Sequence, residues 1–282
     1  MTTWSERLGT VGVWAAYTQL TPELAVDIER LGYGAIWQGG SPTADLTAAE
    51  ELLDATESIT VATGIVNIWR SEPRELADAY HRIVARHPGR LLVGVGSGHR
   101  EGTPHRVRPV QAMSDYLDVL DEYGVPKRDR ALSALGPRML AMSAARSAGT
   151  HPYLTVPAQT AEGRAAVGPG ALVAPEQTLV LESDTAAARA VARDFLTRYL
   201  RLANYAGNLL RAGFTEEDLA GGGSDRLIDD VIVHGDAATL AAAVNAHLGA
   251  GADHVCVQML PAADDIRPAL GAVAAEMGLA GA

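Results

Sequence analysis

The sequence predicts an α/β fold in which parallel strands, each followed by a helix, close into a (β/α)8 TIM barrel. Short apolar runs alternate with amphipathic stretches along all 282 residues. Several runs are continuous, such as 91–95 (Leu-Leu-Val-Gly-Val), which is typical of strands covered on both faces. The main rival is an open parallel sheet of about six strands. No shift in composition marks a boundary, so we expect a single domain over residues 1–282.

Eight apolar runs fit the strands of such a barrel. In chain order they are Thr10–Trp14, Ala35–Gln38, Thr60–Asn67, Leu91–Gly96, Leu132–Leu135, Tyr153–Val156, Thr178–Leu181 and Val255–Leu260. Function in this fold lies at the carboxyl ends of the strands, which shortens the search for a site.

Amphipathic helices are predicted between the strands. The first begins with Thr21 as N-cap and Pro22 as the first helical residue. Two others cover Leu76–His87, stopped by a Pro-Gly pair, and Leu240–Leu248, stopped by glycine. The stretch Thr185–Ala212 has the length and pattern for one long helix.

Composition excludes several classes of protein. The chain has 23 Lys+Arg against 34 Asp+Glu, a net charge of −11, which argues against a nucleic-acid partner. The single cysteine, Cys256, excludes a disulfide framework and a zinc site built on thiolates. No secretory h-region or apolar run of roughly 18 residues is present. We therefore expect a soluble cytoplasmic protein with no membrane and no nucleic-acid partner.

Glycines alternate at the end of the fourth predicted strand, in the segment 94–99 (Gly-Val-Gly-Ser-Gly-His). Without side chains, such a strand end lets a flat or bulky group lie against the backbone, although a tightly packed barrel rim has the same pattern. Because position 99 is histidine, the segment is not a dinucleotide fingerprint.

Two neighbouring segments are candidate anion sites. A basic cluster covers residues 99–108, and Gly136-Pro137-Arg138 opens a helix after the fifth predicted strand. Free N–H groups at a helix N-terminus hold anions. A solvated loop and an ordinary helix start are the alternatives. Together the two segments favour a long, phosphate-bearing ligand.

Other chemistries lack their residues. The eight histidines form no H-x-H or H-E-x-x-H pattern, and there is no G-x-S-x-G elbow or Walker A lysine. Paired strand-end carboxylates are missing as well. We expect no metal, and a barrel of this kind delegates its chemistry to an organic cofactor. Trp14, Trp37 and Trp69 supply flat apolar walls, or simply pack in the core.

A set of short motifs, in order, covers nearly the whole chain. They occupy residues 31–37 (LGYGAIW), 62–69 (ATGIVNIW), 87–99 (HPGRLLVGVGSGH), 134–140 (ALGPRML), 151–154 (HPYL) and 251–255 (GADHV). In their order and spacing the chain resembles the luciferase-like monooxygenase superfamily, in particular its actinobacterial oxidoreductases that depend on the deazaflavin coenzyme F420.

The resemblance implies a bacterial luciferase-like TIM barrel that binds coenzyme F420, or alternatively FMN, at the strand ends. It places a non-proline cis peptide at Gly64–Ile65, behind the cofactor ring. The implied cofactor-binding residues are Gly64, Ile65, Asn67, Gly96, Ser97, Gly98, Ala134, Leu135, Gly136, Pro137 and Arg138. An acidic protein must supply cations for the deazaflavin's phosphate and glutamyl tail, and Arg100, Arg106, Arg108 and Arg138 qualify.

The chain departs from the family at the end of the second strand. Members that oxidise alcohols or sugar phosphates carry an acid and a histidine there, whereas this chain has Gln38-Gly39-Gly40-Ser41, which puts those two activities in doubt. His99 is the first candidate for proton transfer, and Gln38 and His151 are candidates for orienting substrate.

The expected activity is hydride transfer between bound F420 and an unidentified small organic substrate. The alternatives are an FMN-dependent monooxygenase that uses O2 and a partner reductase, and a barrel that binds the cofactor without turnover. The resemblance also implies a homodimer.

Overall fold

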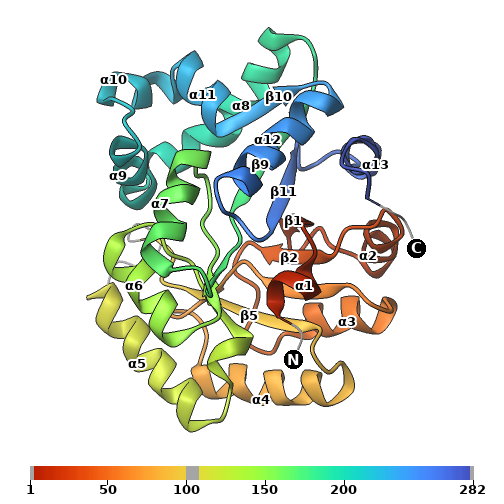
Figure 1. Cartoon of the computed structure of the whole chain (residues 1–282), viewed down its shortest axis with the longest axis vertical. Coiled ribbons are helices and arrows are strands. Elements are labelled where there is room, and N and C mark those ends of the chain that lie inside the picture. The colour runs from red at the N-terminus through yellow and green to blue at the C-terminus, as the bar shows by residue number, and fades with distance from the viewer. Residues whose placement is uncertain (1–2, 100–107, 280–282) are drawn as a thin grey trace.

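A computed structural model describes residues 3–99 and 108–279 (Figure 1). The strands of this part are β1 (Val11–Ala16), β2 (Ala35–Gly39), β3 (Thr60–Thr63), β4 (Val66–Asn67), β5 (Leu91–Gly96), β6 (Arg130–Leu132), β7 (Gly149–Thr150), β8 (Leu172–Val173), β9 (Glu176–Leu181), β10 (Ile232–Gly235) and β11 (Val255–Leu260). The helices are α1 (Trp4–Leu8), α2 (Pro22–Arg30), α3 (Thr47–Ala55), α4 (Pro73–Arg86), α5 (Pro109–Glu122), α6 (Pro137–Arg146), α7 (Pro157–Val167), α8 (Thr185–Leu200), α9 (Ala203–Arg211), α10 (Glu216–Leu219), α11 (Asp225–Val231), α12 (Ala237–Gly249) and α13 (Arg267–Glu276).

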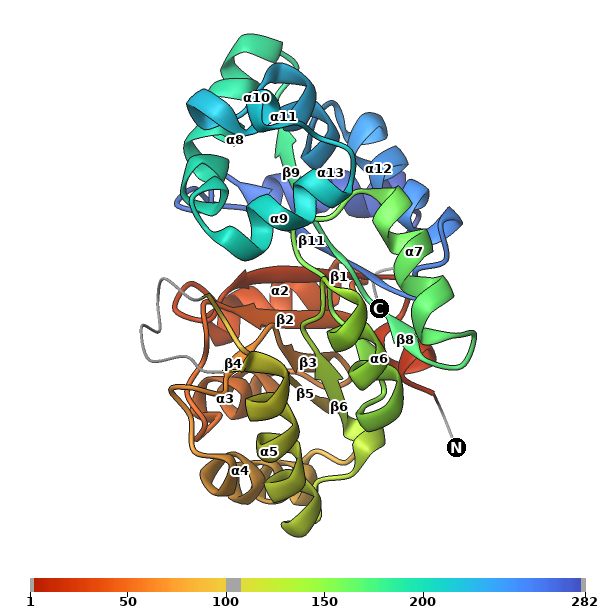
Figure 2. The ribbon, with the colours of Figure 1, turned by 90° about the vertical axis from the view of Figure 1, so that its left-hand side faces the viewer.

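All strand pairs of the described residues are parallel and belong to one curled sheet. Its order is β10-β9-β11-β1-β2-β3-β5-β6-β7-β8, with β4 beside β5. Helices α3 to α6 cover the outer side of the β2–β6 wall, and α8 to α11 gather beyond β9 and β10 (Figure 2). The predicted α/β class with parallel strands is confirmed.

The ladder of strands is TIM-barrel-like but does not close into a ring. Its two halves meet at residues 172–181, where Ala174 and Pro175 separate β8, which pairs with β7, from β9, which pairs with β11. Backbone hydrogen bonds flank this gap on both sides, among them Glu176 N to Pro152 O at 2.9 Å and Cys256 N to Pro175 O at 3.0 Å. The structure therefore has a curled parallel sheet where the sequence predicted a closed ring of eight strands.

Apolar side chains are buried on both faces of the sheet. Along β1, Val13 and Ala15 belong to a core between the sheet and the helices, whereas Trp14 belongs to a second core inside the curl. Ile36 and Trp37 of β2 divide in the same way. This two-sided burial explains why the strands are continuously apolar.

The predicted strands agree best with the observed ones where the apolar run in the sequence is longest. The prediction Leu91–Gly96 matches β5, and Val255–Leu260 matches β11. The strand at Tyr153–Val156 was wrong, because the chain pairs earlier, at β7, and residues 153–156 lead into α7. The fifth strand, predicted at Leu132–Leu135, begins two residues earlier. The strands β8 and β10 were missed because they are too short to leave a pattern.

Helix starts were predicted correctly where a capping residue is present. The Thr21 hydroxyl accepts a hydrogen bond from Leu24 N at 3.2 Å, as an N-cap should.

The single helix predicted over Thr185–Ala212 was wrong, since α8 ends at Leu200 and α9 begins at Ala203. Tyr199 and Tyr205 both contact the Tyr153 ring, with centroids 5.6 and 6.0 Å away. Six residues of one straight helix span about 600°, which would aim the two tyrosines at different faces. The break between the helices lets both of them reach one ring.

In the part of the chain that the structure covers, no helix is both long and apolar enough to cross a membrane.

Candidate active site

A cavity of about 1140 Å³ lies at the carboxyl ends of the strands. The loops after β1, β2, β5, β6 and β7 contribute to its wall, together with the cis bulge between β3 and β4 and the α8–α9 corner. Its position is the one that the barrel-like topology predicts for function.

The floor of the cavity contains a cis peptide bond between Gly64 and Ile65, which confirms this feature of the resemblance. The glycines of β5 make room for this bulge. A Cβ on Gly96 would lie 2.7 Å from the Ile65 side chain, and one on Gly98 would lie 2.5 Å from Asn67 Nδ2. The alternating glycines thus accommodate the neighbouring strand, and Gly96 does not itself line the cavity.

Most of the expected cofactor-binding residues lie together on the cavity wall. Those that line it are Gly64, Ile65, Asn67, Ser97, Gly98, Leu135, Gly136, Pro137 and Arg138. Ala134 is buried behind the wall and does not line it. The loop after β6 therefore meets the bulge in one cavity, although about 70 residues of sequence separate them.

The N-terminus of α6 lies on the cavity wall, at the place where the sequence predicts an anion site. Gly136 is its N-cap, and a Cβ there would meet no atom within 4 Å, so the approach is open. Arg138 is exposed and has no ion-pair partner among the described residues. Arg211 comes from α9 to the same place, where its Nη2 lies 3.5 Å from Leu135 O and 3.1 Å from Asn208 Oδ1.

The charge of this cavity is opposite to that of the protein. Arg138, Arg198 and Arg211 line it, and no aspartate or glutamate of the described residues does. The ion pairs found in the described ranges leave these three arginines without a carboxylate partner. In a chain of net charge −11, such an arrangement favours an anionic ligand.

His151 lies at the inner end of the cavity. It is 2% exposed, its Nδ1 lies 2.8 Å from Ala174 O, and its ring stacks on Trp37 with centroids 4.2 Å apart. Its Nε2 has no partner among the described residues, and the same holds for Nε1 of Trp14, which also lines the cavity. Burial lowers the pKa of His151 to about 4, so the ring is neutral at physiological pH.

His99 lines the cavity beside α9. Its Nδ1 lies 3.3 Å from Asn204 Oδ1, and its ring is tilted against Tyr205 with centroids 5.2 Å apart. The structure thus places His99 on the same cavity wall as most of the expected cofactor-binding residues.

Gln38 does not reach the cavity, although it belongs to the strand end from which we expected it to orient substrate. It pairs in register with Ala15, and it alternates with Trp37, which packs inside the curl. The alternation of a strand therefore turns Gln38 to the helix side of the sheet.

Three tyrosines form a wall that sequence reasoning missed. The Tyr153 hydroxyl donates to Gln258 Oε1 at 2.7 Å and lies 3.1 Å from the Tyr199 hydroxyl, while Tyr205 packs against both rings. Burial raises the pKa of Tyr153 well above its usual value, so its hydroxyl stays protonated. The three come from different elements and form no motif, which is why no sequence signal indicated them.

Arg198 extends this wall. Its guanidinium lies over the rings of Phe195 and Tyr199, 4.7 and 4.8 Å from their centroids, and its Nη2 is 3.3 Å from the Tyr199 hydroxyl.

None of the other arginines that were expected to bind the cofactor is found on the described wall of the cavity. Arg100 and Arg106 lie outside the described residues. Arg108 precedes α5 in a left-handed conformation, with φ of 46°, and does not line the cavity.

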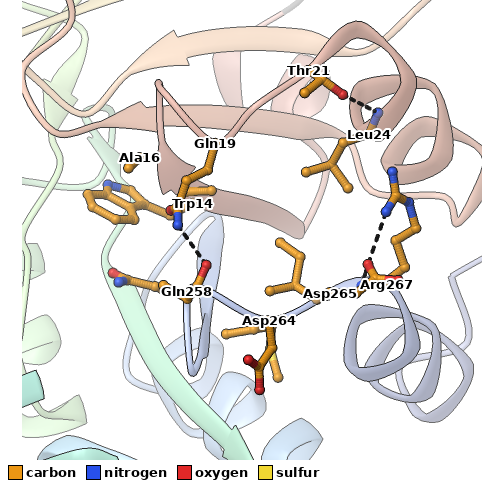
Figure 3. A pocket seen from close by; sticks show the side chains of 13 residues that line it. Trp14, Ala16, Gln19, Thr21, Leu24, Gln258, Asp264, Asp265 and Arg267 are labelled. Atoms are coloured by element: carbon orange, nitrogen blue, oxygen red, sulfur yellow. Dashed lines mark hydrogen bonds and ion pairs between the residues drawn. The ribbon is translucent and has the colours of Figure 1, made fainter. Parts of the chain in front are cut away.

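A smaller pocket of about 200 Å³ adjoins the cavity and shares Trp14, Gln19 and Gln258 with it (Figure 3). Gln19 Nε2 donates to Ala262 O at 2.6 Å, and Asp265 pairs with Arg267 at 3.0 Å. This pocket carries carboxylates, unlike the main cavity.

Within residues 3–99 and 108–279, no group of three His, Cys, Asp or Glu side chains is placed to hold a metal ion.

Comparison with known structures shows where this architecture recurs. An F420-dependent secondary alcohol dehydrogenase in complex with an F420–acetone adduct has a TM-score of 0.76 and 14% identity, over 96% of this chain and 98% of that one. The coenzyme F420-dependent tetrahydromethanopterin reductase from Methanopyrus kandleri has a TM-score of 0.68 and 17% identity, over 97% of this chain and 99% of that one. The oxygenating constituent of 3,6-diketocamphane monooxygenase from Pseudomonas putida, in complex with FMN, has a TM-score of 0.67 and 13% identity. The likeness covers 95% of this chain and 98% of that one. At these identities the likeness shows the fold.

A family profile matches part of the sequence. No curated protein sequence matches the chain significantly. Residues 8–123, which run from the end of α1 through β5 and α5, match the profile of the luciferase-like monooxygenase family. The chain thus matches the luciferase-like monooxygenase family over this part of its sequence, and it shares its fold with the compared F420- and FMN-dependent enzymes along nearly its whole length.

Proposed function

We propose that this protein is an oxidoreductase that binds coenzyme F420 in the strand-end cavity and passes hydride between it and a small organic substrate. The observation that carries the proposal is the charge of the cavity. Arg138, Arg198 and Arg211 line it without any described carboxylate, although the chain is strongly acidic. The deazaflavin has a phosphate and an acidic glutamyl tail, whereas FMN has only the phosphate, so three arginines fit the deazaflavin better.

The residues present fit such a group. Gly136 leaves an open approach to the N-terminus of α6, where Arg138 and Arg211 would hold the phosphate. At the inner end, Trp14 and His151 carry buried polar atoms that no group in the described part of the chain satisfies. The cis peptide Gly64–Ile65 lines the same cavity beside Trp14 and His151 and would back the ring. When bound, the deazaflavin would supply the hydride donor or acceptor.

The chain's own side chains would handle the proton. Reduction of a carbonyl, imine or conjugated double bond needs a proton as well as a hydride, and the described wall offers no carboxylic acid. We assign proton transfer to His99, at the end of the β5 segment. The tyrosines at 153, 199 and 205 would exclude water and present hydroxyls that burial keeps protonated.

Paired titration of the cofactor-free protein with F420 and with FMN, followed by fluorescence at low and moderate salt, tests the proposal. We expect micromolar or tighter F420 binding that weakens with salt, and little binding of FMN. The reverse preference would favour the FMN-dependent monooxygenase, which oxygen uptake with reduced FMN would then check. Binding of neither would overturn the cofactor assignment.

Tight F420 binding without turnover of any enone, imine or nitro compound would instead indicate a cofactor-binding barrel. A matched variant sharpens the titration, because Arg226 pairs with Asp218 at 3.0 Å outside the cavity. Arg226→Gln should keep the salt dependence of F420 binding, whereas Arg198→Gln should reduce it.

A further inference from the structure

We propose that Trp14 and His151 recognise the imide edge of the pyrimidinedione ring that F420 and FMN share. In this assignment Trp14 Nε1–H donates to a ring carbonyl, and His151 Nε2 accepts from the ring's N3–H. The inference rests on the proposed function only in requiring that a flavin-type ring occupies the cavity, and it holds for either cofactor.

The two atoms are unpaired polar groups in otherwise closed surroundings. Trp14 is 7% exposed and His151 is 2% exposed, and both line the cavity. Within residues 3–99 and 108–279, neither Trp14 Nε1 nor His151 Nε2 has a hydrogen-bond partner. Buried polar groups are nearly always paired, so a group without a partner that faces a cavity indicates a ligand.

The ring of His151 is fixed as an acceptor toward the cavity. Its Nδ1 lies 2.8 Å from the carbonyl oxygen of Ala174, which only a protonated Nδ1 can bond. The neutral ring then carries a lone pair on Nε2. The Trp14 indole offers only a donor, so the pair presents one donor and one acceptor.

The other two buried histidines show that this lack of a partner is specific. His254 has Nδ1 at 2.8 Å from Gly9 O, and its Nε2 accepts from Trp37 Nε1 at 3.0 Å. His247 has Thr160 Oγ1 at 2.7 Å and Gln177 Oε1 at 2.9 Å. Both nitrogens of each ring are paired, and only His151 keeps a ring nitrogen for the cavity among these three.

Gly64 brings the donor and the acceptor to one place. A Cβ on this residue would lie 2.9 Å from His151 Nε2 and 2.9 Å from Trp14 Nε1, so both atoms face the same point beside the cis peptide. A ligand that meets both must accept and donate from adjacent atoms. The imide edge, O=C–N–H, has this order of groups, and it belongs to a flat ring that fits against a bare glycine.

Methylation of the ligand's N3 atom tests the contact directly. Lumiflavin and 3-methyllumiflavin, with their 5-deaza counterparts, are titrated by fluorescence into the wild type, Trp14→Phe and His151→Ala. We expect methylation to weaken binding to the wild type about tenfold, and to cost little in His151→Ala, where the methyl group has room and no acceptor is lost. Trp14→Phe should weaken the binding of the N3–H and the N3-methyl probes by the same factor, about tenfold. Trp4→Phe, whose indole N–H bonds Arg128 O away from this cavity, is the control and should change neither.

An equal methylation penalty in the wild type and in His151→Ala would overturn the assignment while leaving the proposed function intact. If none of these chromophores binds the wild type, this assignment falls, and the titration with intact F420 and FMN decides the proposed function separately. Should a variant not fold, 15N NMR of the wild type reports the same contact. The His151 Nε2 signal should move to lower chemical shift with lumiflavin and stay in place with 3-methyllumiflavin, and an unmoved signal with both would overturn the contact.

Discussion

His151 Nδ1 and the carbonyl oxygen of Ala174 are 2.8 Å apart, and this bond determines which ring nitrogen faces the cavity. It links the residue after β7 to the residue after β8, the pair of short strands at the end of the ladder. The carbonyl favours the protonated Nδ1, but burial prevails and holds the pKa of His151 at about 4.

The buried histidines make stability depend on pH. Burial lowers the pKa of His151, His247 and His254 from 6.5 to about 4. Between these values the unfolded chain binds more protons than the folded one, so stability is full above about pH 6.5 and falls as the pH falls toward 4. Each histidine contributes at most about 1.4 kcal/mol per pH unit. Urea unfolding from pH 7.5 to 5 measures the slope, and a free energy of unfolding that rises on acidification would contradict this account.

Glu176 has the opposite effect. It is fully buried, accepts from Thr178 Oγ1 at 2.5 Å and Leu154 N at 3.2 Å, and burial raises its pKa from 4.5 to about 7. Its contribution is present below about pH 4.5 and is lost as the pH rises through 7. Glu176→Gln keeps an acceptor without the charge, so its stability relative to the wild type should increase from pH 5 to pH 8, by on the order of 1 kcal/mol or more. A pH-independent difference in urea unfolding would show that the carboxyl titrates normally.

The sequence predicted strands and helices correctly where a segment has one clear local pattern, such as a continuous apolar run or a capping residue. The continuous runs of β5 and β11 indicate strands buried on both sides, and Thr21 marks the start of α2. Short pairings such as β8 and β10 depend on neighbours distant in sequence and leave no local pattern. The break between α8 and α9 depends on Tyr153, more than 40 residues earlier, so periodicity alone did not reveal it.

The site was predictable in its backbone and less so in its side chains. The family motifs located Gly64–Ile65 and Gly136–Arg138, because the resemblance maps both segments directly onto this sequence. Arg198 and Arg211 come from the α8–α9 corner, and only the tertiary fold carries them to the cavity. Gln38 was misplaced because a shift of one residue along a strand reverses its face.

Gly39 gives the Trp14 indole the room it occupies. A Cβ on Gly39 would lie 1.9 Å from Trp14 Cζ2, and the ring also packs on Tyr153 with centroids 5.1 Å apart. Gly39→Ala should therefore destabilise the protein by about 1–3 kcal/mol through overpacking. Gly163→Ala, in the middle of α7 with no atom within 4 Å of the added Cβ, is the control and should stabilise by roughly 0.5–1 kcal/mol. Urea midpoints measure both, and equal stability of the wild type and Gly39→Ala would show that Trp14 moves aside freely.

Gly136 is the position at which the proposed phosphate site can be tested. Its φ of −116° suits any residue, and an added Cβ meets no atom within 4 Å, so Gly136→Asp should fold. The new carboxylate would repel a phosphate at the start of α6 and weaken FMN or F420 binding at least tenfold. Gly136→Asn, with the same shape and no charge, is the control. Riboflavin, which lacks the phosphate, should bind Gly136→Asp and Gly136→Asn alike, and an undiminished affinity of Gly136→Asp for the phosphorylated cofactor would remove the phosphate assignment.

Substitutions of His99 distinguish a role in proton transfer from a role in cofactor binding. Its ring lies on Tyr205, and its Nδ1 faces Asn204 Oδ1, both on the α9 side of the cavity. If the ring transfers a proton, His99→Ala should slow oxidation of reduced F420 by an accepted enone, imine or nitro compound about 100-fold or more. Cofactor affinity should stay within about tenfold of the wild type. Stopped-flow absorbance measures the rate, and fluorescence titration measures the affinity. His99→Gln, which keeps a donor toward Asn204 but titrates nowhere near neutral pH, should be as slow as alanine and should abolish the histidine limb of the pH–rate profile. A normal rate in His99→Gln would reduce the role of His99 to supporting the α9 corner, and a large loss of affinity in His99→Ala would make it a cofactor-binding residue.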